Sequence, residues 1–161
     1  MKDVLLVAGL LAAPFTTSVQ AYRVQQPSVD HKDPRLSQLK KFFADRDSPL
    51  KDSAGDFLLA ADQNALDWRL LPSISMIESS GGKDYRNNNV FGWASCKERF
   101  PSVRAGIHYV AAQLGKSSRY RGKDVKGKLR LYNPLPEYPG RVEAVMRAIG
   151  SCSQPRVLAA D

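Results

Sequence analysis

Hydrophobic positions recur at helical spacing over much of the chain, so that each apolar stretch covers one face of a predicted helix. The first stretch begins at Pro34, which suits a first helical turn, and Asp33 before it is a candidate cap. The second covers residues 53–65, after a connection that contains Ser48 and Pro49. Both stretches predict core helices, and we assign them no chemistry.

A third apolar stretch, residues 70–82, contains one acidic side chain. Leu71, Ile74 and Ile77 share a helical face, and Glu78 lies on that face or beside it. The glycines that follow at positions 81 and 82 predict the end of the helix, because glycine readily adopts the left-handed conformation that stops one. Glu78 is therefore expected close to the negative end of the helix dipole and next to apolar side chains.

Both features disfavour the charged form of the Glu78 carboxyl group. A carboxylic acid that keeps its proton is what cleavage of a glycosidic bond requires, because the leaving oxygen must be protonated as the bond breaks. The alternative is a glutamate at a helix end that simply points to solvent. The spacing alone leaves both interpretations open.

The residues that follow favour the catalytic interpretation. Three asparagines at positions 87–89 offer amide groups suited to sugar hydroxyl and acetamido groups, and Phe91 and Trp93 offer flat faces for a sugar ring. Each feature alone has a simpler explanation, since asparagine is common in turns and aromatic residues are common in cores. Together with Glu78 they predict a saccharide cleft.

The rest of the chain predicts two more helices around a basic segment. Ser102 can cap a helix that ends at Gly115, and Pro139 begins a last helix that ends near Gly150. Residues 116–130 between them are rich in lysine and arginine. Such a segment suits an anionic partner, although a merely solvated basic face is an equally good interpretation.

Length and charge narrow the class of protein. With 161 residues, of which 43% are hydrophobic, one globular domain is expected. The formal charge of +8 favours nucleic acid, an anionic membrane or acidic wall polymers as partners. Residues 1–21 resemble a cleavable signal peptide, with an apolar run too short to span a bilayer and a small-residue pattern ending at Ala21. We therefore expect a periplasmic or secreted protein, with a flexible tether over 22–33 and a loose tail over 153–161.

Export gives the cysteines a possible structural role. Cys96 and Cys152 are the only two in the chain, so an oxidising compartment allows one intramolecular disulfide, and two free thiols are the alternative. The cysteines show no zinc-ligand spacing with His31 and His108. We expect no metal and no cofactor.

Several motifs in order resemble the lysozyme-like superfamily, close to lytic transglycosylases and bacterial glucosaminidase-type domains. The resemblance covers roughly residues 36–150 and depends most on 78–83 (ESSGGK), 88–93 (NNVFGW) and 132–134 (YNP). It implies a mainly α, lysozyme-like domain over residues 34–152, with about six helices around a saccharide cleft. It also implies that Glu78 is the general acid.

The same resemblance implies which residues bind the substrate. They are Ser80, Asn89, Phe91, Gly92, Trp93, Tyr132, Asn133 and Tyr138. Tyr132 and Asn133 would face Glu78 across the cleft, where the tyrosine hydroxyl could donate to substrate or to the acid itself.

A second catalytic carboxylate is not evident. Most glycosidases use two, but Asp84, Glu98 and Glu137 each have an ordinary surface explanation. The sequence therefore favours a single-acid route completed by water or by a hydroxyl of the substrate, the second of which gives an anhydro-sugar in lytic transglycosylases.

The expected function is that of an exported enzyme that cleaves peptidoglycan glycan strands, either as a lytic transglycosylase or as an N-acetylglucosaminidase or muramidase. We expect a monomer without a transmembrane anchor, bound to glycan strands and, through its basic surface, to anionic wall polymers or lipopolysaccharide rather than nucleic acid. The alternative is a non-catalytic peptidoglycan-binding or adaptor protein with the same fold. A cationic membrane-active protein is the third.

Overall fold

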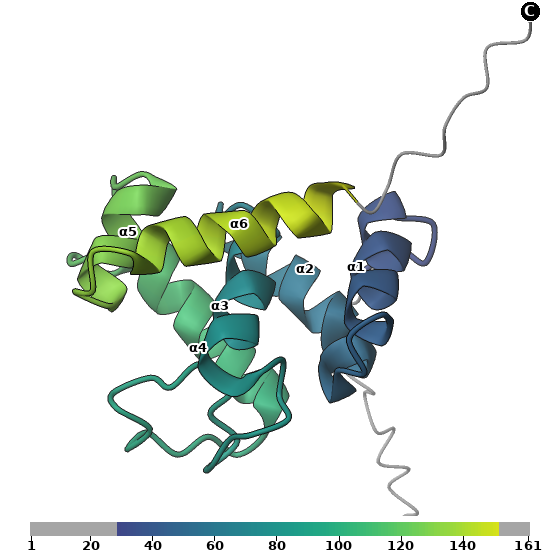
Figure 1. Ribbon diagram of the computed structural model, residues 1–161, viewed down its shortest axis with the longest axis horizontal. Helices are drawn as coiled ribbons and strands as arrows, with labels where there is room; N and C mark the ends of the chain where they lie inside the picture. Colours follow the sequence, from purple (N-terminus) through teal and green to yellow (C-terminus); the bar gives the residue numbers. More distant parts are fainter. Residues whose placement is uncertain (1–28, 152–161) are drawn as a thin grey trace, which may run out of the picture.

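The computed structural model describes residues 29–151, and within that range it consists of helices and irregular loops (Figure 1). No sheet forms among these residues, and an isolated antiparallel bridge joins Arg86 to Asn89. The elements are α1 (Pro34–Ala44), the 3-10 helix η1 (Pro49–Ser53), α2 (Ala54–Gln63), α3 (Leu70–Ser79), α4 (Val103–Lys116), α5 (Val125–Tyr132) and α6 (Tyr138–Ser151). The expectation of a mainly α fold with about six helices is confirmed.

Local capping signals explain where two of the predicted helices begin. The Asp33 carboxylate accepts a hydrogen bond from the backbone N–H of Arg35 at 2.9 Å, and the Ser102 hydroxyl accepts one from Ala105 at 3.1 Å. Helix α5 was not predicted, although Asp124 caps it in the same way through the N–H of Gly127 at 2.7 Å. Side-chain caps satisfy donors that the helix itself leaves unpaired.

Two predicted helix ends differ from the structure. Helix α3 stops at Ser79, because Ser80 already adopts the left-handed conformation with φ 52°, before the glycines at 81 and 82. The predicted stop at Gly115 is wrong, since α4 continues to Lys116. A Cβ atom at position 115 would lie 2.5 Å from the carbonyl oxygen of Asn64, so this glycine allows α4 to approach the end of α2.

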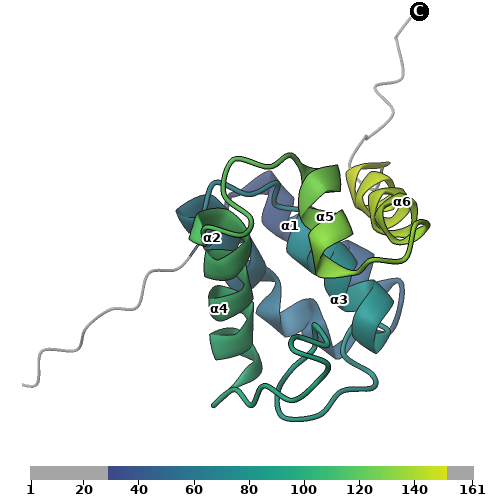
Figure 2. The ribbon, with the colours of Figure 1, turned by 90° about the vertical axis from the view of Figure 1, so that its left-hand side faces the viewer.

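The helices enclose one core. Helix α6 packs along α3, and α4 packs along α2 (Figure 1). In the turned view, α5 and α6 lie on the opposite side from α4, and the long loop after α3 lies between them (Figure 2). Four buried phenylalanines form a contiguous run through the core, with neighbouring ring centroids 5.6–6.2 Å apart: Phe42, Phe43, Phe57 and Phe91. This run ties the loop after α3 to the first two helices.

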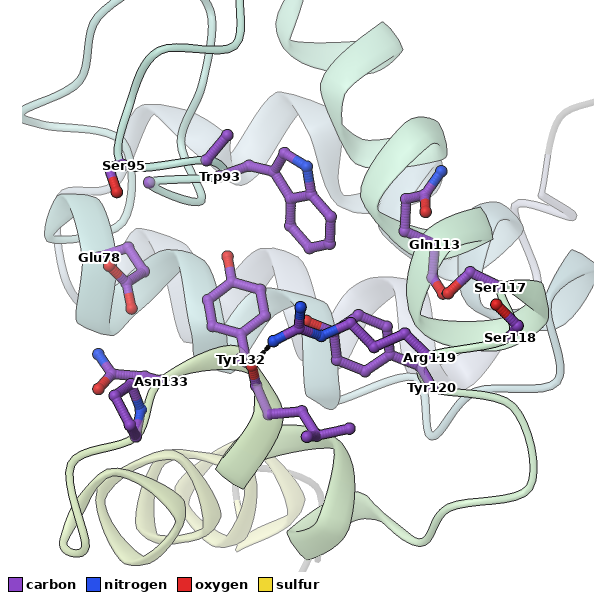
Figure 3. Close-up of a pocket in the computed structure, with 14 residues that line it drawn as sticks. Glu78, Trp93, Ser95, Gln113, Ser117, Ser118, Arg119, Tyr120, Tyr132 and Asn133 are labelled. Carbon is purple, nitrogen blue, oxygen red and sulfur yellow. Dashed lines mark hydrogen bonds between the residues drawn. The ribbon is translucent and has the colours of Figure 1, made fainter.

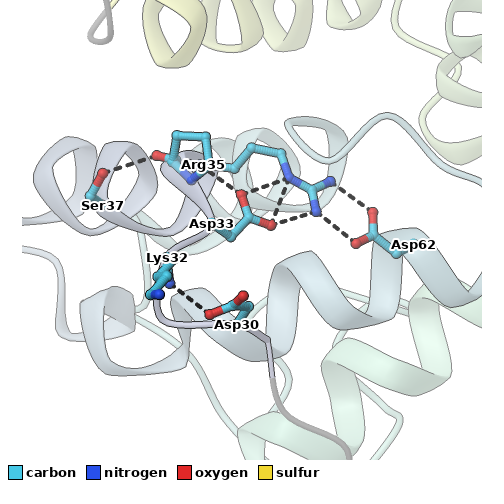
Figure 4. Close-up of polar contacts among 7 residues, drawn as sticks. Asp30, Lys32, Asp33, Arg35, Ser37 and Asp62 are labelled. Carbon is cyan, nitrogen blue, oxygen red and sulfur yellow. Dashed lines mark hydrogen bonds and ion pairs between the residues drawn. The ribbon is translucent and has the colours of Figure 1, made fainter.

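The first described residues are held against the helices. Val29 packs on the core, and the guanidinium of Arg35 bridges the carboxylates of Asp33 at 2.7 Å and Asp62 at 2.8 Å (Figure 4). The bridge joins the start of α1 to the end of α2. The expected tether over 22–33 thus has a fixed C-terminal part, whereas residues 22–28, the expected signal peptide and the expected tail lie outside the described residues.

Over residues 29–151, no helix is both long enough and apolar enough to cross a bilayer.

Candidate functional site

A cleft of about 770 Å³ opens beside the C-terminal end of α3. Residues from four separate parts of the chain line it: the end of α3, the loop at 92–95, the end of α4 with its following turn, and the end of α5 (Figure 3). The side chains that matter for its chemistry are Glu78, Trp93, Ser95, Gln113, Ser117, Ser118, Arg119, Tyr120, Tyr132 and Asn133. The cleft therefore forms only when the loop and three helices have assembled.

Glu78 is half-buried, and both of its carboxyl oxygens have close neighbours. The hydroxyl of Tyr138 donates to Oε1 at 2.6 Å. Gly92, at φ +61°, lies so near that a Cβ atom there would be 2.9 Å from Oε2. The absent side chain at position 92 thus allows the loop to approach the acid, and the carboxyl group is fixed in one orientation.

Ser79, next to Glu78, connects the end of α3 to this loop. Its hydroxyl donates to the carbonyl oxygen of Val90 at 2.8 Å and accepts from the N–H of Gly82 at 3.0 Å. The backbone at 90–92 is therefore fixed relative to the helix that carries the acid.

Two stacked tyrosines lie beside the acid. The rings of Tyr132 and Tyr138 are 6.0 Å apart and nearly parallel, at 9°. Burial raises the pKa of both hydroxyls, and the neighbouring Glu78 raises it further. Both therefore remain protonated donors near neutral pH: Tyr138 donates to Glu78, and Tyr132 donates to the carbonyl oxygen of Phe91 at 2.5 Å. The sequence left open whether the Tyr132 hydroxyl meets the substrate or the acid; in the structure the hydroxyl that reaches the acid is that of Tyr138.

Trp93 occupies the centre of the cleft. Its ring lies 5.6 Å from that of Tyr132 and 6.3 Å from that of Tyr120, measured between centroids, and its side chain is partly exposed. An aromatic surface is thus exposed to the cleft, and the predicted contact of Trp93 with a sugar ring stays a prediction. Phe91, also predicted to bind substrate, is instead fully buried against Phe57.

The three predicted amide groups do not line the cleft. Each donates to backbone carbonyls of its own loop: Asn87 to Cys96 at 3.3 Å, Asn88 to Phe100 at 2.8 Å, and Asn89 to Trp93 at 2.9 Å and Glu98 at 3.2 Å. Asn89 also accepts from the N–H of Trp93 at 3.0 Å. These asparagines hold the irregular loop in shape and orient Trp93 rather than meet a ligand.

The remaining predicted residues divide in the same way. Asn133 lines the cleft, and its side-chain oxygen Oδ1 accepts from the backbone N–H of Leu135 at 3.1 Å. Ser80 is exposed outside it. The structure therefore brings Gly92, Trp93, Tyr132 and Asn133 to the cleft beside Glu78, with Tyr138 behind the acid, and leaves Ser80, Asn89 and Phe91 out.

Among residues 29–151, Glu78 is the only carboxylate that lines the cleft. None of the candidate partners lines it, and two of them, Asp84 and Glu137, are exposed elsewhere on the surface. Any proton transfer to or from a substrate in this cleft by a carboxyl group thus depends on Glu78.

The sequence did not reveal the end of the cleft formed by Gln113, Ser117, Ser118 and Arg119. A buried lysine fixes this end: the Lys128 ammonium donates to the carbonyl oxygens of Leu114 at 2.9 Å and Tyr120 at 2.8 Å. Burial, followed by the nearby charge of Lys123, lowers the pKa of Lys128. The only signal in the sequence was the density of basic residues, which does not indicate which of them turns inward.

The predicted cysteine pair is described only in part. Cys96 is an exposed thiol on the loop after Trp93, and Cys152 lies outside the described residues, so the disulfide stays a prediction. Over residues 29–151, no group of three or more histidine, cysteine, aspartate or glutamate side chains is arranged to hold a metal ion.

Comparison of the chain with protein-family models, with curated proteins and with solved structures found no match.

Proposed function

We propose that this protein is an exported enzyme that cleaves the glycan strands of peptidoglycan, with Glu78 as its general acid. The observation that carries the proposal is a single half-buried carboxyl group, oriented by a tyrosine and a glycine, at the side of an aromatic-lined cleft. A cleft of about 770 Å³ is large enough for a ligand of several rings. Trp93 and Tyr132 supply flat faces on which sugars can lie.

In this mechanism one carboxyl oxygen of Glu78 accepts a hydrogen bond and the other donates the proton. Oε1 accepts the hydrogen bond from Tyr138, so Oε2 is the oxygen that carries the proton and delivers it to the leaving glycosidic oxygen. Once the proton has left, the same Tyr138 donor stabilises the carboxylate, because hydrogen bonds to charged acceptors are stronger than those to neutral ones.

The second step also uses Glu78. The carboxylate takes a proton from the attacking group, which is either water or a hydroxyl of the substrate. The described part of the chain places no second carboxylate in the cleft to activate water separately, which favours attack by a substrate hydroxyl and hence an anhydro-sugar product. Hydrolysis, in the manner of a muramidase or glucosaminidase, is the other outcome.

The lysozyme-like fold is part of the same proposal. It is supported by the mainly helical architecture and by an acid at the end of a helix beside an irregular, aromatic loop. A location in the periplasm or outside the cell is supported by the signal-like residues 1–21, and wall polymers or lipopolysaccharide as further partners by the charge of +8.

The test compares wild type and Glu78→Gln on purified peptidoglycan. Glutamine retains an oxygen that can accept from Tyr138 and has nearly the same size, so the fold should persist while the proton donor is lost. We expect release of soluble muropeptides to fall by at least about 100-fold, the scale of general acid catalysis. Glu137→Gln, the same change at an exposed glutamate outside the cleft, should release as much as wild type.

Mass spectrometry of the products identifies the reaction. Anhydromuramic ends indicate a transglycosylase, whereas reducing N-acetylmuramic acid or N-acetylglucosamine ends indicate a hydrolase. Undiminished release by a correctly folded Glu78→Gln protein would refute the role of Glu78. Co-sedimentation with sacculi without any product from wild type would instead favour a non-catalytic wall-binding or adaptor protein.

A further inference from the structure

The cleft contains a cationic group, the guanidinium of Arg119, that the cleavage step does not use. Figure 3 shows Glu78 and Asn133 at one end of the cleft and Gln113, Ser117 and Ser118 at the other, with Trp93 and Tyr132 between them. Arg119 comes from the turn after α4 at this second end, and its side chain reaches back so that the guanidinium lies beside Tyr132, across the cleft from Trp93 (Figure 3). A ligand that spans the cleft from the acid past Trp93 therefore meets a guanidinium group.

Arg119 is oriented but not neutralised. One of its terminal N–H groups donates to the carbonyl oxygen of Leu131 at 3.1 Å, and its guanidinium carbon lies 5.7 Å from the centroid of the Tyr120 ring. Among residues 29–151 it forms no ion pair with a carboxylate. Guanidinium carries five N–H donors, so most of them remain available to a ligand.

The surroundings of Arg119 add neutral donors and further positive charge. Gln113 and Ser118 make no side-chain hydrogen bond to another residue in the described part of the chain, and both line the cleft. The segment 116–130 contains seven basic residues and one acidic residue. An anionic group is thus favoured here both by short-range donors and by the wider field.

This end of the cleft is rigid. The buried Lys128 fixes the end of α4 and the turn through its two carbonyl contacts, and Tyr120, also buried, packs against Trp93. Burial raises the pKa of Tyr120, and the positive charge of Arg119 opposes that rise, so the field of the guanidinium extends to a residue that lines the cleft. A fixed donor loses little conformational freedom when it binds a ligand.

We propose that Arg119 forms a subsite for a carboxylate group carried by the glycan strand, across the cleft from Trp93 and on the far side of Tyr132 from the acid. Gln113 and Ser118 supply neutral donors further along the cleft. The planar fork of arginine matches a carboxylate in bidentate geometry. This inference rests on the proposed function, because the substrate strand supplies the carboxylate. The subsite selects strands that carry this group over neutral sugar polymers.

Two sources of the carboxylate are chemically equivalent. In strands with peptide stems, the lactyl group is an amide and the carboxylates belong to the peptide. In strands without stems, the lactyl carboxylate itself is free. Two matched pairs of ligands separate them: stem-free strands and their methylamide derivative, and stem-bearing strands and theirs.

The experiment measures the dissociation constant of each ligand by calorimetry, in Glu78→Gln protein so that no strand is cut. We expect at least one carboxylate ligand to bind about 10-fold more tightly than its methylamide partner, and the pair that shows this preference identifies the source. Adding Arg119→Met should abolish the preference and leave binding of the methylamides unchanged. Arg119→Lys should retain part of it, since charge without the fork still attracts a carboxylate.

Arg121→Met is the matched control, because Arg121 is exposed on the same segment but does not line the cleft. It should leave every dissociation constant as in the parent. Equal weakening of neutral and carboxylate ligands by Arg119→Met would overturn the subsite, as would a preference that persists in that variant.

Failure of the subsite and failure of the proposed catalytic role give different experimental results. A catalytic failure appears as undiminished cleavage by Glu78→Gln, whereas the subsite is tested by binding alone and holds even if the protein is a wall-binding adaptor. If the protein binds none of the four ligands, both the subsite and the proposed substrate are overturned.

Discussion

At the scale of single residues, the orientation of one carboxyl group, that of Glu78, depends on two neighbouring residues. Glu78 is fixed from one side by the hydroxyl of Tyr138 and from the other by the backbone of Gly92. These two residues lie 60 and 14 positions further along the chain. The acid is thus oriented by tertiary contacts and not by its own helix.

Tyr138→Phe isolates the contribution of this hydrogen bond. The ring can still stack on Tyr132, so we expect the fold to persist with a loss of about 1–2 kcal/mol in the free energy of unfolding. The turnover number for peptidoglycan should fall about 10-fold or more with little change in KM, because the hydroxyl contacts the acid rather than the sugar. Tyr85→Phe, at an exposed tyrosine, is the control. An unchanged turnover number would mean that Gly92 and the loop alone orient Glu78.

At the scale of elements, glycine has different roles in different helices. In α4, a side chain at position 115 would meet the backbone of Asn64, whereas in α2, a Cβ atom at Gly55 would have nothing within 4 Å. Substitution by alanine should therefore have opposite effects at the two positions.

Gly115→Ala should lower the free energy of unfolding by about 1–3 kcal/mol, because α4 must move away from the end of α2. Gly55→Ala should raise it by about 0.5–1 kcal/mol through helix propensity. Urea denaturation of both variants and wild type measures the difference. Stabilisation by Gly115→Ala would show that the two helices separate easily.

The same elements show how far sequence reasoning extends. The starts of α1 and α4 were predictable, because the cap and the first turn are adjacent in the sequence. Helix α5 was missed, since its segment is dominated by charge and one of its two buried residues is Lys128. Burial of a lysine depends on two carbonyl groups from other segments, which no local pattern reveals.

The site was predictable to a similar degree. Glu78 and Trp93, which both line the cleft, could be selected from the sequence because an acid at a helix end and an aromatic loop are local signals. The direction of the asparagine amides could not be predicted, because backbone conformation turns them inward; Asn87 and Asn88 both have positive φ. The position of the Arg119 guanidinium in the cleft requires the turn after α4 to meet α5, a contact that only the folded chain contains.

At the scale of the whole molecule, buried tyrosines link stability to alkaline pH. Burial raises the pKa of Tyr132 and Tyr138 above the ordinary value of 10.0, and Glu78 raises it further. Above about pH 10 the unfolded chain therefore releases protons that the folded protein keeps. The unfolded state then binds fewer protons, so the free energy of unfolding decreases as the pH rises.

Each of the two hydroxyls contributes a slope of up to about 1.4 kcal/mol per pH unit above that point. Tyr132→Phe and Tyr138→Phe should each make the decrease shallower, whereas Tyr85→Phe should not. Urea midpoints measured between about pH 8 and pH 11 test this. Parallel curves for all four proteins would show that neither buried hydroxyl is linked to unfolding.

The single carboxyl group of the cleft has a last consequence for the catalytic cycle. In the proposed reaction, Glu78 gives up one proton and then receives one from the attacking hydroxyl, so it ends each turnover in the form in which it began. No proton need enter from the surrounding buffer. The turnover rate should then be independent of buffer concentration at constant pH and ionic strength. In such a cycle the substrate itself returns the proton to the enzyme.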